Sequence, residues 1–173
     1  ALSYSAAVLA SQVTADDGNN DDSAFGFAVF GAAKLALSDM FSVQGALNFT
    51  DGANGYLWRS GSNYYGPSAF VNGSGIETIS GYGGSLGVSM ALGGGSSINL
   101  GYGTTSLDLD DAVAAGAASN ADPETNQNVL LNYKWTPAKN VMMGVEYGYL
   151  DQETVGGEST DSNRVMFAAQ YNF

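Results

Sequence analysis

Apolar and polar residues alternate along most of this chain. The alternation is clearest in positions 164–173, where every second side chain is apolar: Val165, Phe167, Ala169, Tyr171 and Phe173. Successive side chains of a β-strand point to opposite faces, so this period of two predicts a strand with one apolar and one polar face. An edge strand of a soluble β-sandwich would show the same alternation.

Eight segments follow this pattern and are predicted to be strands: 2–13, 23–37, 41–50, 76–92, 97–107, 127–135, 141–150 and 162–173. The connections between them are predicted to alternate between long and short. Long loops at one end and short turns at the other are typical of transmembrane β-barrels. We therefore predict an all-β, antiparallel, up-and-down transmembrane barrel segment covering 1–173. A helical turn is also expected in the alanine-rich stretch 112–118.

The composition agrees with this fold and excludes several functions. The sequence contains no apolar run long enough for a transmembrane helix, whereas a barrel strand needs only about 9–11 residues. The net charge of −12 argues against a nucleic-acid partner. Histidine and cysteine are both absent, which excludes His-based catalysis and His metal sites. No catalytic constellation or phosphate-binding loop is found, so we expect neither an enzyme nor a cofactor.

Acidic residues are concentrated in the four predicted long loops, which contain 14 of the 17. The clusters at 16–22 and 108–111 carry oxygen ligands that suit Ca²⁺, but they do not match the twelve-residue calcium-loop pattern. We expect solvated loops and no metal site. Bridging of these loops to lipopolysaccharide by divalent cations is the alternative.

Aromatic residues of the predicted apolar face fall near the strand ends. Aromatic rings suit a membrane interface, where apolar and polar surroundings meet. We predict two girdles, one at the loop end (Phe25, Phe27, Phe49, Tyr147 and Tyr149) and one at the turn end (Phe41, Tyr133, Trp135, Tyr171 and Phe173).

The C-terminal residues also carry a resemblance. A terminal Phe preceded by an aromatic two residues earlier resembles the closing strand of bacterial outer-membrane barrels. Tyr133, the turn Thr136–Lys139, the run Gly144–Tyr147 and the pair Asn163-Arg164 resemble the C-terminal part of the DcaP-like porins of Gram-negative bacteria. The resemblance implies a 16-stranded barrel in the outer membrane, usually a homotrimer, that passes small and often anionic solutes. The eight strands would then be its C-terminal half.

The residues themselves allow a complete small barrel or part of a larger one. An open eight-stranded sheet exposes unpaired backbone groups at both edges, so in lipid either its first and last strands pair or further strands close it. Interiors of eight-stranded barrels are filled by side chains. The polar face here is mostly Gly, Ala, Ser and Asn, which favours the larger barrel. The chain also starts within a strand pattern and has no signal peptide, so we expect residues upstream.

Charged and amide side chains of the polar face are the candidate site. We predict that ten residues line a pore: Lys34, Gln44, Asn48, Glu77, Asn99, Asn132, Lys134, Glu146, Arg164 and Gln170. Arg59, in the longest loop, is a candidate constriction residue, and the alternative is an arginine on the loop surface. Lys134, Glu146 and Arg164 lie on consecutive strands and would create a transverse field in a pore. In a small barrel they would instead form a packing salt-bridge cluster.

These observations predict passive diffusion of small hydrophilic solutes through an outer-membrane porin, for which the resemblance implies a homotrimer and anionic solutes. The basic residues of the polar face would favour anions, whereas the acidic loops would favour cations. The partners of such a porin would be outer-membrane lipid, lipopolysaccharide and the solutes, and no nucleic acid. The alternative is a non-conducting eight-stranded barrel with a structural or adhesive role through its acidic loops. A soluble ligand-binding sandwich is a further alternative.

Overall fold

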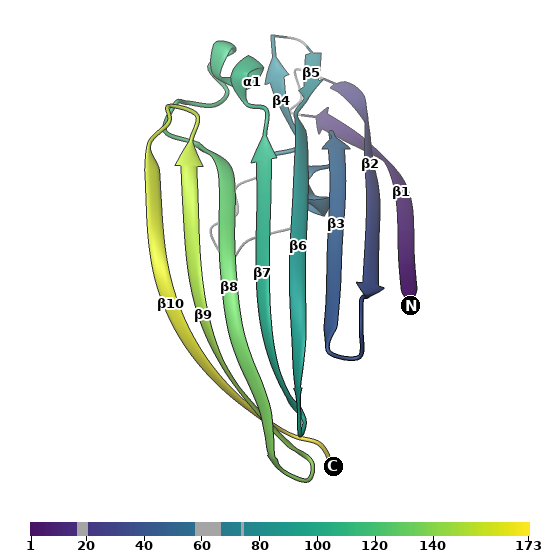
Figure 1. Ribbon diagram of the computed structural model, residues 1–173. Helices are drawn as coiled ribbons and strands as arrows, with labels where there is room; N and C mark the ends of the chain where they lie inside the picture. The colour runs from purple at the N-terminus through teal and green to yellow at the C-terminus, as the bar shows by residue number, and fades with distance from the viewer. Residues whose placement is uncertain (17–20, 58–66, 74) are drawn as a thin grey trace.

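The computed structural model describes residues 1–16, 21–57, 67–73 and 75–173. In this part of the chain, eight long strands form one curved sheet in the order β1-β2-β3-β6-β7-β8-β9-β10 (Figure 1). All neighbours are antiparallel, so the prediction of an all-β antiparallel fold is confirmed. The strands are β1 (Leu2–Asp16), β2 (Asp21–Ala36), β3 (Phe41–Asp51), β6 (Ser80–Gly93), β7 (Ser96–Leu107), β8 (Pro123–Ala138), β9 (Val141–Thr154) and β10 (Ser159–Tyr171).

The segment predicted as one strand over 76–92 is two elements. A separate hairpin pairs β4 (Ala69–Asn72) with β5 (Gly75–Thr78), and β6 starts only at Ser80. Between them the backbone of Ile79 bonds to loop residues: its N–H donates to the Ser68 carbonyl, and its carbonyl accepts from the Gly52 N–H. The period of two continues through this break because β5 is itself a strand. Alternation therefore could not reveal that the pairing partner changes.

Two of the connections predicted to be long are short. β1 and β2 extend to Asp16 and from Asp21, and β9 and β10 extend to Thr154 and from Ser159. The acidic residues there are typical of loops, but the register pairs Asp16 with Asp21 and Asp151 with Asp161 as strand residues. The two long connections that remain, β3 to β6 and β7 to β8, lie at the same end of the sheet (Figure 1).

The long connections contain two short helices. They are the 3₁₀ turn η1 (Asn54–Tyr56) and the helix α1 (Asp110–Ala114), which begins just before the expected alanine-rich stretch. Among the residues described, no helix has the length and hydropathy to cross a membrane.

Strand register gives the sheet two chemically distinct faces. Residues directly opposite each other in neighbouring strands share a face. One continuous row is entirely apolar: Leu35, Val43, Val88, Leu100, Leu131, Tyr147 and Val165. The adjacent row lies on the other face: Lys34, Gln44, Gly87, Gly101, Leu130, Gly148 and Arg164. We call these the apolar face and the polar face.

Large side chains of the apolar face are exposed. Val8 is 80% exposed, and Leu47 and Val165 are each 73% exposed. Soluble proteins rarely expose a contiguous apolar surface of this extent, because leaving it in water is unfavourable. The face therefore requires apolar surroundings.

The buried core lies at the loop end of the sheet. It consists of Leu57, Ile79, Leu107, Leu109 and Ala112, with Phe70, Ala118 and Val155 packed against it. Three connections contribute to this loop core, so it fixes them to one another. Asp22 adds a polar tie, since its carboxylate accepts from the Ile76 N–H at 3.0 Å and so joins β2 to the β4–β5 hairpin.

The sheet is open in the described part of the chain. β1 and β10 are its two edges and do not pair with each other (Figure 1). The barrel is therefore not closed by pairing of the first strand with the last, which was one of the two alternatives. Each edge strand leaves one row of backbone N–H and C=O groups without a strand partner.

Candidate functional site

A chain of side-chain hydrogen bonds crosses four strands on the polar face. The Ser89 hydroxyl donates to Asn99 Oδ1 at 2.5 Å, and Asn99 Nδ2 donates to Asn132 Oδ1 at 2.7 Å. Asn132 Nδ2 then donates to Glu146 Oε2 at 3.3 Å. The register places these four residues opposite one another on β6, β7, β8 and β9. Neighbouring strands lie about 4.8 Å apart, a gap that short amide side chains can bridge.

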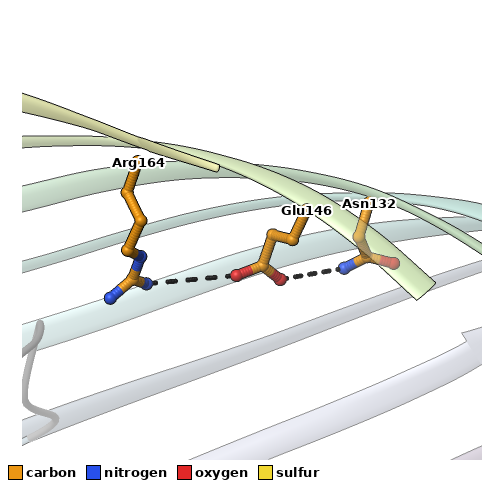
Figure 2. A network of polar contacts seen from close by, with 3 residues as sticks. All are labelled: Asn132, Glu146 and Arg164. Atoms are coloured by element: carbon orange, nitrogen blue, oxygen red, sulfur yellow. Dashed lines mark hydrogen bonds and ion pairs between the residues drawn. The ribbon is translucent and has the colours of Figure 1, made fainter. Parts of the chain in front are cut away.

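Arg164 continues this chain from the edge strand β10. Its Nη2 lies 4.0 Å from Glu146 Oε1, and Figure 2 shows the guanidinium, the carboxylate and the Asn132 amide in line. The residue opposite Arg164 is Gly148, so the guanidinium meets no side chain there and passes over the glycine toward Glu146. We call Ser89, Asn99, Asn132, Glu146 and Arg164 the polar ladder.

The ion pair between Arg164 and Glu146 fixes the position of the two charged groups and adds little to the stability of the fold. The side chains of Arg164 and Glu146 are 43% and 23% exposed. Ion pairs this accessible to water contribute about 0–1 kcal/mol. The Asn132 amide donates to one oxygen of the Glu146 carboxylate, and the Arg164 guanidinium lies beside the other.

Two lysines lie beside the ladder around a hollow in the polar face. A cavity of about 310 Å³ is lined by residues of five strands, among them Lys34, Gln44, Asn99, Asn132 and Lys134. In the described residues the only ion pair is that of Arg164 with Glu146, so neither lysine has an acidic partner there. Gly101 leaves the backbone bare on this wall, since a Cβ there would meet nothing within 4 Å, whereas the Gln44 side chain lies over Gly87. The result is a water-accessible wall with more positive than negative charge.

The remaining predicted pore residues are dispersed. Asn48 is on the polar face nearer the loop end, where Nδ2 donates to the Tyr56 carbonyl at 3.3 Å. Gln170 is at the exposed end of β10 and bonds to Asn172. Glu77 does not share this wall: it lies on β5, outside the eight-stranded sheet, and accepts from Asn72 Nδ2 at 2.8 Å. Arg59 lies outside the described residues.

Sequence reasoning missed Asn54. This asparagine is fully buried and bonds to both arms of the connection between β3 and β6. It lies in a stretch where Gly, Asn, Ser and Tyr all recur, and no periodicity separates it from its neighbours. Its role becomes clear only from the fold, which brings Ser68 and Ile79 within hydrogen-bond distance of Asn54.

Aromatic rings gather at both ends of the apolar face. Phe27 and Phe49 lie 5.9 Å apart between ring centroids, and Tyr133 stacks on Trp135 at 5.3 Å. The Tyr102 hydroxyl donates to Gln127 at 2.9 Å. Gln127 lies two residues nearer the loop end than Val129, the residue directly opposite Tyr102. Tyr147 likewise donates to Asn163. A phenol with its ring among apolar residues and its hydroxyl turned toward polar ones suits a membrane interface.

Acidic residues cluster where β7 and β8 meet the loops. At this end of β8, burial raises the pKa of Glu124, and the charges of Asp110, Glu153 and Asp108 add to the rise. In the part of the chain that the structure describes, no three acidic residues are arranged to hold a metal ion. The cluster at 16–22 falls partly outside the described residues.

Comparison with known proteins finds a similar solved structure that bears on function. No protein-family model matches the sequence. No curated protein matches it either. Among solved structures, the outer membrane channel DcaP of Acinetobacter baumannii is similar, with a TM-score of 0.85 and 28% sequence identity. The match covers 99% of this chain and 47% of the channel, so the chain spans about half the length of that relative.

That relative is a channel and not an enzyme, which agrees with the lack of a catalytic constellation in the sequence. The extent of the match is consistent with one half of such a porin, the C-terminal one. The similarity supports localisation to the outer membrane, and the resemblance to the DcaP-like outer-membrane porins is confirmed.

Proposed function

We propose that this chain supplies the C-terminal strands of a 16-stranded, homotrimeric porin for passive diffusion of small hydrophilic solutes, including anions. The observation that carries the proposal is the open, two-faced sheet. Its apolar face suits lipid, and its polar face is water-accessible and built largely from small side chains.

The two free edges support a larger ring. In lipid each unpaired backbone group costs several kcal/mol, so β1 and β10 both need strand partners. β1 and β10 run in opposite directions, so an even number of further antiparallel strands closes the ring. Eight more strands agree with a relative about twice as long as this chain.

The polar face of β6 supports an open interior. Its inward positions are Gly81, Gly83, Ser85, Gly87, Ser89 and Ala91. Eight-stranded barrels fill their interior with side chains, which these residues are too small to do. In a wider barrel the positions from Ser85 to Ala91 face water, while Leu57 lies over Gly81 and Asn48 over Gly83.

The wall charges support a preference for anions. Lys34, Lys134 and Arg164 lie on the polar face with Glu146 as their only acidic neighbour in the polar ladder. Glu124, in the acidic loop-end cluster, lies ten residues along β8 from Lys134, roughly 33 Å at about 3.3 Å per residue. The screening length is about 8 Å at physiological ionic strength. The lysines therefore dominate the potential where an ion passes them.

Reconstitution of the full-length protein in planar bilayers tests this function. We expect ohmic conductance that appears in steps of three, since each trimer inserts three pores at once. Lipopolysaccharide contacting the loop end of the apolar face would be the neighbouring partner in the native membrane. Bilayers that stay silent although the protein inserts would favour the non-conducting, adhesive barrel instead.

Reversing the charge of Arg164 should change ion selectivity and leave folding intact. In Arg164→Glu the new carboxylate lies beside Glu146, so the basic end of the ladder becomes acidic. We expect the reversal potential in a KCl gradient to shift toward cations, with Arg164→Gln giving a smaller shift in the same direction. Unchanged reversal potentials in both variants would remove Arg164 from the pore wall.

A further inference from the structure

The connection between β3 and β6 folds back against the polar face. η1 lies beside β3, below the upper ends of the strands (Figure 1). Asn48, on the polar face of β3, holds the Tyr56 carbonyl. Leu57 is 3% exposed, and its Cδ1 would lie 2.8 Å from a Cβ built on Gly81. Residues 53–57 therefore occupy space on the inner side of the sheet, and Gly81 provides room for them.

Asn54 is the anchor of this segment. Its side chain is fully buried and joins three places in the chain. Nδ2 donates to the carbonyls of Pro67 at 2.8 Å and Ile79 at 2.9 Å, and Oδ1 accepts from the Thr50 hydroxyl at 2.5 Å. The backbone N–H of Asn54 donates to the Ser68 hydroxyl at 3.0 Å.

Few side chains can replace this asparagine. The site needs two N–H donors and one acceptor within the reach of a short side chain. Aspartate has no donor, glutamine is one methylene longer, and leucine has the shape without the polar atoms. A buried carbonyl or hydroxyl that loses its partner costs about 1–3 kcal/mol, so the contacts cannot be exchanged for packing alone.

We propose that Asn54 is a positioning residue that holds residues 53–57 inside the pore and thereby sets the size limit for solutes at the loop end. The inference rests on the proposed porin function. Without the anchor the segment leaves the wall, and the passage between it and the opposite wall widens. Charge selectivity, which arises from the lysines and the polar ladder farther along the wall, is unaffected.

The test compares Asn54→Leu with Asn72→Leu. Asn72 bonds to Glu77 on the exposed β4–β5 hairpin, so it is a matched asparagine in the same connection but away from the pore wall. The measurements are single-channel conductance and liposome swelling with neutral sugars of increasing size. We expect Asn54→Leu to raise the conductance and to admit larger sugars severalfold faster, with an unchanged reversal potential in a KCl gradient. Asn72→Leu should behave as the parent protein.

A second variant covers the case in which Asn54→Leu does not fold. Thr50→Val removes only the hydroxyl that donates to Asn54 and should shift conductance and sugar size limit in the same direction by a smaller factor. If the parent protein conducts but both variants keep its conductance and size limit, or conduct less, Asn54 does not control the pore width. If the parent protein itself does not conduct, the porin function fails instead.

Discussion

Leu100→Arg should lower the free energy of unfolding by about 2–4 kcal/mol, whereas Gly101→Arg should leave it nearly unchanged. A cationic side chain on the lipid face near the bilayer midplane costs about this much, and much less on the water-filled side. The two positions are adjacent on β7, so they lie at almost the same depth. Leu100 is 50% exposed on the apolar face, and Gly101 lies on the polar face with open space where its Cβ would be.

The measurement is urea unfolding in lipid vesicles, followed by the heat-dependent shift of the folded band in gel electrophoresis. Each variant controls for the other, because both introduce the same arginine side chain at neighbouring positions. Gly101→Arg should also reduce the single-channel conductance, since its side chain enters the pore. Equal losses of stability at both positions, or a larger loss at Gly101, would invert the assignment of the two faces.

Replacing both cavity lysines by glutamate should reverse the charge preference of the proposed porin. The interaction energy between a unit charge and an ion 4 Å away is on the order of 1 kcal/mol even in water. One kcal/mol is roughly a fivefold change in local ion concentration. Lys34→Glu with Lys134→Glu should therefore change the anion-to-cation permeability ratio by about tenfold or more. The reversal potential in a KCl gradient should change sign.

Lys139→Glu is the matched control for this pair. Lys139 lies in the short turn between β8 and β9, outside the cavity, and the substitution makes the same charge change. It should leave the reversal potential almost unchanged. An equal shift in Lys139→Glu would mean that net charge, and not the wall of the cavity, determines selectivity.

Alternation was sufficient to predict an antiparallel sheet because one face of the sheet is apolar and the other is polar. Each strand of the main sheet carries that contrast, so the order of residues alone assigns Leu100 and Gly101 to opposite faces. Alternation did not place Glu77 outside the main sheet, because β4 and β5 form a hairpin whose faces alternate in the same way. A period of two identifies a strand but not its partner.

The contacts of the candidate site depend on register, which one-dimensional patterns do not contain. The sequence places Lys134, Glu146 and Arg164 on consecutive strands, but the ladder also needs Asn132 directly opposite Glu146 and a glycine opposite Arg164. The anchor Asn54 depends on chain segments that return from more than ten residues away. Such long-range placement is decided by the packing of the loop core.

The bare backbone at Gly101 also makes this protein convenient to engineer. The sequence contains no cysteine, so Gly101→Cys would introduce the only thiol in these 173 residues. That thiol would lie in open space on the wall, between the strands that carry the ladder residues Ser89 and Asn132. In the proposed porin, a thiol-reactive adapter attached there would lie in the path of passing molecules, and the protein would become a sensor with a single, chemically defined recognition point.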